Sequence, residues 1–126
     1  MTTPRYLEPV EQVHIDRARL ACLGRSMGRD AATRVVEHAL EDVAERICAI
    51  RLAWCSGEFA RMVKGARTLI AVAEQIGMAS VAEVAGDVIA TLDARDEAAL
   101  AAVVARLVRV GDASLDRAAR AEILSI

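Results

Sequence analysis

A helical repeat of apolar residues over 30–57 constrains the fold of this chain more than any other feature. Its members recur at alternating spacings of four and three, so they share one side of an α-helix instead of alternating between the faces of a strand. They are Val36, Leu40, Val43, Ile47, Ile50 and Trp54. A period of ~3.5 residues is typical of bundled helices. We therefore expect a long helix that buries this stripe against partner helices.

Shorter segments before and after this helix carry apolar stripes with a similar period. They are found at about 16–26, 58–76, 80–92 and 96–110, with a last amphipathic stretch at 114–126. Both prolines, Pro4 and Pro9, lie in the first ten residues. Since proline interrupts helices by removing a backbone donor, none of these segments is interrupted in that way.

Polar residues and glycines mark the expected ends of the helices. Asp16, Asp30 and Asp96 suit N-cap positions, because a carboxylate accepts hydrogen bonds from the free N–H groups of a first turn. Ser80, with Glu83 three residues later, matches a capping box. Glycine commonly ends helices because it adopts the left-handed conformation without strain. The expected terminating glycines are Gly57, Gly77 and Gly111.

The connections between the four main helices are short, which favours antiparallel neighbours. The predicted fold is therefore all-α: an antiparallel up-down four-helix bundle with a short extra N-terminal helix and a C-terminal helical extension. This prediction divides the chain into an N-terminal arm at 1–12, the bundle at 13–112 and the extension at 113–126.

Composition argues against several classes of partner. Hydrophobic residues make up 55% of the chain but aromatic residues only 2%, and the interleaved charges sum to −2. Binding to nucleic acid depends on clustered basic residues, so we expect no nucleic-acid partner. The longest apolar run, at 98–105, is much shorter than the ~20 residues that span a bilayer. With no segment resembling a signal peptide, we expect a cytoplasmic protein without a membrane partner.

The residues that support catalysis or metal binding are sparse. The sequence lacks the common phosphate-loop, dinucleotide, metalloprotease and nucleophile-elbow motifs. His38 precedes Glu41, the reverse of the Glu-x-x-His order used by metal-binding bundles. The three cysteines lack metal-site spacing, so free thiols are expected. We therefore expect no enzyme activity, no metal and no cofactor, and His38, which faces away from the stripe at ~100° per residue, is expected to be exposed.

The order of helices and turns carries a resemblance to a known family. A short helix precedes a long helix ending in Ser-Gly-Glu at 56–58, and a second long helix ends in Ile-Gly-Met at 76–78. Two helices rich in alanine and valine follow, joined by Asp-Ala-Arg-Asp at 93–96. This pattern, over about 15–112, resembles a bacterial histidine-containing phosphotransfer (Hpt) domain. The resemblance implies a four-helix bundle in a phosphorelay between receiver domains.

The Hpt motif is His-x-Leu-Lys-Gly, followed by a Leu-Gly-Ala turn. Aligning that turn on 76–78 places Arg67 at the phosphate-accepting position, and the rest of the motif falls on Leu69, Ile70 and Ala71. A second alignment, on Lys64 and Gly65, places the acceptor at Arg61 and breaks the spacing to Gly77. Arginine stays protonated and is not a nucleophile. The resemblance therefore implies a member that does not carry phosphate at the usual site.

The same resemblance implies a receiver or histidine-kinase domain as partner. The guanidinium of Arg67 can bind a carboxylate or phosphate through two parallel hydrogen bonds. The predicted partner-binding residues are Lys64, Arg67, Ile70, Ala71 and Glu74. Two alternatives stay open: a structural or oligomerisation module with no signalling partner, and an active phosphotransfer protein that uses His38, with Arg34 one turn before it. The sequence does not set an oligomeric state.

Overall fold

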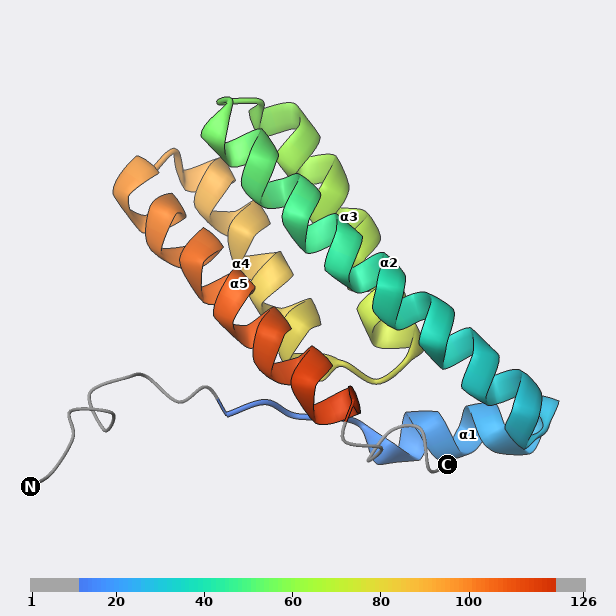
Figure 1. Ribbon diagram of the computed structural model, residues 1–126. Coiled ribbons are helices and arrows are strands. Elements are labelled where there is room, and N and C mark those ends of the chain that lie inside the picture. Colours follow the sequence, from blue (N-terminus) through green and yellow to red (C-terminus); the bar gives the residue numbers. More distant parts are fainter. Residues whose placement is uncertain (1–11, 120–126) are drawn as a thin grey trace, which may run out of the picture.

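The computed structural model describes residues 12–119, and five α-helices account for most of that segment (Figure 1). The helices are α1 (Arg17–Met27), α2 (Arg29–Cys55), α3 (Phe59–Gln75), α4 (Ala79–Ala94) and α5 (Glu97–Ala119). No strand occurs within residues 12–119, so the predicted all-helical class is confirmed. In the same segment, no helix has both the length and the apolar character needed to cross a bilayer.

Helices α2 to α5 pack into a helical bundle. Helix α3 contacts α2 and α4, while α5 contacts α4 and returns to α2 (Figure 1). Helix α1 packs against α2 at one end of the bundle. Turns of two or three residues, at 56–58, 76–78 and 95–96, join the bundle helices. Such short turns keep successive helices adjacent.

The core is aliphatic and rich in alanine, as the composition indicates. The predicted stripe of α2 faces it: Val36, Val43 and Ile50 are fully buried, and Ile47 is 8% exposed. The last predicted member of the stripe, Trp54, is only half-buried. Because the other helices contribute mainly valine, leucine and alanine, the backbones can approach closely without aromatic side chains.

Two of the predicted caps are confirmed. The Asp16 carboxylate accepts a hydrogen bond from the backbone N–H of Arg19, at 3.1 Å. Asp96 accepts one from the N–H of Ala99, at 3.0 Å. Each satisfies a donor that the first helical turn leaves free.

The other two predicted caps are wrong. Asp30 lies within the first turn of α2, because Gly28, at φ +85°, ends α1 and also serves as the N-cap of α2. Helix α4 begins at Ala79, one residue before Ser80. The Ser80 hydroxyl instead accepts a hydrogen bond from the backbone N–H of His14, 66 positions earlier, at 2.7 Å.

The predicted helix end at Gly111 is also wrong. Helix α5 continues through this glycine to Ala119, so the described part of the predicted extension, 113–119, belongs to a bundle helix. Gly111 is buried, and a Cβ there would overlap the side chain of Ile47 on α2. Its role is therefore close helix packing, and Ala118 beyond it is also buried. Residues 120–126, like most of the predicted arm, lie outside the described residues.

A strap formed by residues 12–16 crosses the end of the bundle where α3 turns into α4. The backbone N–H of Asp16 donates to the carbonyl of Gly77, at 2.7 Å. His14 bonds to Ser80 two residues earlier in the strap. These bonds join the start of the described chain to its middle.

The same strap seals apolar side chains. Val13 is 8% exposed, and its carbonyl accepts a hydrogen bond from Nη1 of Arg117 on α5, at 2.8 Å. Beneath the strap, Ile76 and Met78 of the α3–α4 turn are fully buried. We call this the strapped end; the opposite end, with turns 56–58 and 95–96, is the open end.

Candidate partner-binding site

The five residues that the sequence predicts for partner binding lie along the outer side of α3. Lys64, Arg67, Ala71 and Glu74 are exposed, and Ile70 is half-buried against the core. Spacings of three and four place them on one side of the helix. The structure therefore brings the predicted residues together on one accessible strip.

The packing of α3 explains why only this strip is accessible. Helix α3 lies between α2 and α4. Its inner side, formed by Met62, Ala66, Leu69 and Ala73, is fully buried. Because two flanks and the inner side are covered by protein, a partner can reach α3 only from outside the bundle.

The cations of the strip are available to an incoming group. The ammonium of Lys64 and the guanidinium of Arg67 have no hydrogen bond or ion pair with other residues in 12–119. Arg61, the acceptor position of the second alignment, lies 3.5 Å from the Glu58 carboxylate. Glu74, toward the other end of α3, carries the opposite charge. The strip is therefore cationic at the end nearer the start of α3 and acidic at the other end.

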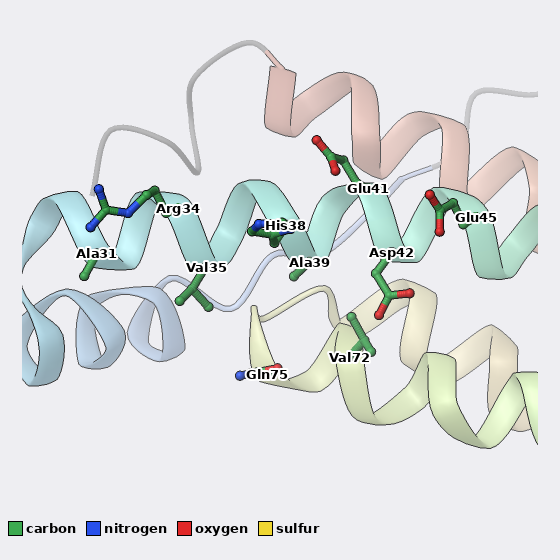
Figure 2. Close-up of a pocket in the computed structure, with 10 residues that line it drawn as sticks. All are labelled: Ala31, Arg34, Val35, His38, Ala39, Glu41, Asp42, Glu45, Val72 and Gln75. Atoms are coloured by element: carbon green, nitrogen blue, oxygen red, sulfur yellow. The ribbon is translucent and has the colours of Figure 1, made fainter.

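His38 lies in a separate groove between α2 and α3, with a volume of about 810 Å³ (Figure 2). Its side chain is exposed, as the sequence predicts. The groove is lined by Ala31, Arg34, Val35, His38, Ala39, Glu41, Asp42, Glu45, Val72 and Gln75. Sequence reasoning missed it because its width depends on how α3 packs, although the spacing of 34, 38, 41 and 45 places those residues on one side of α2.

Charge limits what the His38 groove can do. Three carboxylates, from Glu41, Asp42 and Glu45, share it with one cation, Arg34. Asp42 is partly neutralised by Arg46, whose Nε lies 3.0 Å away. Since like charges repel, this surface disfavours an incoming phosphoryl group. Among residues 12–119, no three His, Cys, Asp or Glu side chains are placed to share a metal ion.

Comparison with known proteins assigns no family to this chain. No protein-family model, curated protein or solved structure matches this chain. The assignment of a function therefore depends on the surfaces themselves. The three cysteines, Cys22, Cys48 and Cys55, are exposed free thiols, as predicted.

Proposed function

We propose that this chain is an Hpt-like protein of a cytoplasmic two-component phosphorelay. In this proposal α2 to α5 form an antiparallel four-helix bundle that binds a receiver or histidine-kinase domain without carrying phosphate on α3. The supporting observation is Arg67, an exposed arginine on the outer side of α3 whose guanidinium has no partner among the described residues.

The chemistry of the strip suits an acidic partner surface. A guanidinium forms paired, charge-assisted hydrogen bonds with a carboxylate or phosphate. Lys64 adds a second cation one turn before Arg67. The small side chain of Ala71, one turn after Arg67, allows a partner helix or loop to approach the backbone. Arginine residues are also frequent among those that dominate binding energy at interfaces.

The same residue excludes phosphate transfer at this position. Transfer requires a side chain with a free lone pair that attacks the aspartyl phosphate. The guanidinium of an arginine lacks such a lone pair. His38 has a suitable imidazole, but the carboxylates of its groove oppose the approach of a phosphorylated loop. Binding without transfer is therefore the function that these charges favour.

Binding of receiver and histidine-kinase domains from the source organism tests the proposal. Arg67→Glu should weaken binding at least ~10-fold, which corresponds to ~1.4 kcal/mol, because it sets like charges against each other. Arg51→Glu is the matched control, since Arg51 is an exposed arginine on the outer side of α2. Equal loss in both variants, or no binding by the wild type, would favour a structural module instead.

A phosphotransfer assay separates the proposal from its active alternative. Wild-type protein incubated with phosphorylated receiver domains should acquire no acid-labile phosphate. The His38→Ala variant provides the control, because His38 is exposed and its replacement leaves the core unchanged. Phosphate that appears on the wild type and disappears in this variant would contradict the proposal and identify His38 as the acceptor.

A further inference from the structure

The open end of the bundle carries an apolar surface separate from the strip on α3. Phe59, the first residue of α3, is 44% exposed there. One hollow of about 440 Å³ lies between Phe59 and the α4–α5 turn, with Val63, Leu92 and Leu100 in its lining. A second hollow is also lined by Phe59, together with Trp54 and Leu100. The two share Phe59, Glu97 and Leu100, so we treat them as one two-part groove.

The strapped end shows how this protein covers a comparable surface. There, a short extended segment inserts Val13, which becomes buried, and an arginine binds the segment's backbone. At the open end, no described segment runs across the α2–α3 and α4–α5 turns (Figure 1), and Phe59 stays exposed. A large apolar side chain left exposed beside a hollow is typical of a binding surface.

The charges around the groove indicate the chemistry of an occupant. Asp93, Asp96 and Glu97 lie along its edge, against one cation, Arg95. Asp96 caps α5 through one carboxylate oxygen, at 3.0 Å from the N–H of Ala99. This excess of carboxylates attracts lysine or arginine and repels nucleic acid or an anionic membrane.

The backbone at the edge of the groove is held in an uncommon conformation. Arg95 has φ +55° and is the one non-glycine residue with positive φ among the described residues. Glycine is the usual residue at such a helix end. An arginine there retains a long side chain at the groove at the expense of some stability, and residues held this way cluster at binding sites.

We propose that the groove around Phe59 binds a short segment of a partner protein that carries an apolar anchor residue flanked by lysine or arginine. The anchor occupies one of the hollows beside Phe59, and the basic residues pair with Asp93 and Glu97. This surface is independent of the strip around Arg67, so either proposal can fail without the other.

The single tryptophan of the chain, Trp54, provides the readout because it lines the second hollow. The probe is a synthetic peptide of about 12 leucine and lysine residues in amphipathic order, a length that spans several helical turns. Titration should give a saturable change in Trp54 emission that weakens as salt rises. Peptides with glutamate for lysine, or serine for leucine, should bind at least ~10-fold more weakly.

Matched variants locate the binding. Phe59→Ser should weaken it at least ~5-fold, whereas Leu52→Ser should not, although Leu52 is 61% exposed on α2. Asp93→Asn combined with Glu97→Gln should flatten the salt dependence without altering the core, and the pair Glu37→Gln with Glu41→Gln serves as the charge control. Circular dichroism confirms that each variant is folded, and Arg67→Glu should bind the peptide like the wild type.

Four outcomes would overturn the proposal. These are equal loss in the Leu52→Ser and Phe59→Ser variants, binding of the glutamate peptide as strong as that of the lysine peptide, and the absence of any saturable change. The fourth is evidence that something other than a basic peptide segment binds in the groove. Light scattering that shows a dimer lost in Phe59→Ser would identify a second copy, and Phe59-dependent binding to phosphatidylserine vesicles would identify a membrane.

Discussion

The two ends of the bundle use the same turn in different surroundings. At the open end, Gly57 donates to the carbonyl of Trp54 and Glu58 to that of Ala53, at 3.1 and 2.9 Å. At the strapped end, the corresponding bonds from Gly77 to Glu74 and from Met78 to Ala73 measure 3.2 and 2.8 Å. Both glycines have positive φ, +69° and +75°. Each turn is thus a Schellman motif, in which a backbone N–H after the helix donates to the carbonyl five residues earlier.

What differs is the tertiary contact. A Cβ at Gly57 would meet nothing within 4 Å, whereas one at Gly77 would lie 2.6 Å from the carbonyl oxygen of Asp16. The local sequence determines the turn, and the strap determines whether the turn becomes part of the core. We therefore expect equivalent substitutions at the two ends to differ in their effect on stability.

The largest difference should come from apolar truncation. Ile76→Ala at the strapped end should lower the free energy of unfolding by roughly 2–5 kcal/mol, because it leaves a cavity at a fully buried position. Phe59→Ala should cost about 1 kcal/mol, since its side chain is 44% exposed. Chemical denaturation measures both. Similar losses would mean that the two ends are equally packed.

Substitution of the turn glycines separates backbone strain from contact. Gly57→Ala should cost about 1–2 kcal/mol for the left-handed backbone alone. Gly77→Ala should cost the same plus at least ~1 kcal/mol, because the added methyl group overlaps the Asp16 carbonyl and forces apart the hydrogen bond from the Asp16 N–H to the Gly77 carbonyl. Thermal unfolding followed by circular dichroism provides the comparison, and equal melting temperatures would show that the strap contributes nothing.

Removing the Ser80 hydroxyl should have a smaller effect on stability, because it breaks one hydrogen bond of the strap and leaves the turn itself unchanged. Ser80→Ala should destabilise by about 1 kcal/mol, because the N–H of His14 loses its acceptor. Ser56→Ala, in the turn at the open end, should change stability by less than ~0.5 kcal/mol, as expected for an exposed surface position. Hydrogen exchange at the His14 amide should accelerate in the first variant only. Unchanged exchange there would contradict the assigned bond.

The smallest expected effect is a gain. Arg95→Gly should raise stability by roughly 0.5–1 kcal/mol, because relief of the left-handed strain exceeds the entropy that glycine loses on folding. Arg95→Ala keeps the strained backbone and should show no gain. A loss of stability in the glycine variant would mean that the Arg95 side chain holds the open end together.

Sequence reasoning succeeded where short-range chemistry decides the structure. The apolar period predicts the buried side of α2, and Asp16 and Asp96 cap helices through residues three positions later. It failed where the deciding partner is distant in the chain. The Ser80 hydroxyl accepts a hydrogen bond from the strap instead of capping α4. Gly111 lies inside α5 and leaves room for the side chain of Ile47 instead of ending the helix.

The candidate surfaces divide in the same way. The exposure of Lys64, Arg67 and His38 follows from helical spacing alone. The hollows beside Phe59 and the groove at His38 depend on the distance between neighbouring helices. Side-chain packing sets this distance, so the residue spacing within one helix does not predict it.

The hydrogen bond between Arg117 and Val13 spans 104 positions. During synthesis on a ribosome, which proceeds from the amino end, the strap can reach the α3–α4 turn once Ser80 has emerged. Its bond to Arg117 forms only after nearly all of the described chain has been translated. Contacts between distant segments are slow to form because a long loop must close first. The bond from Arg117 to Val13 is therefore the last of the strap's hydrogen bonds to form during synthesis.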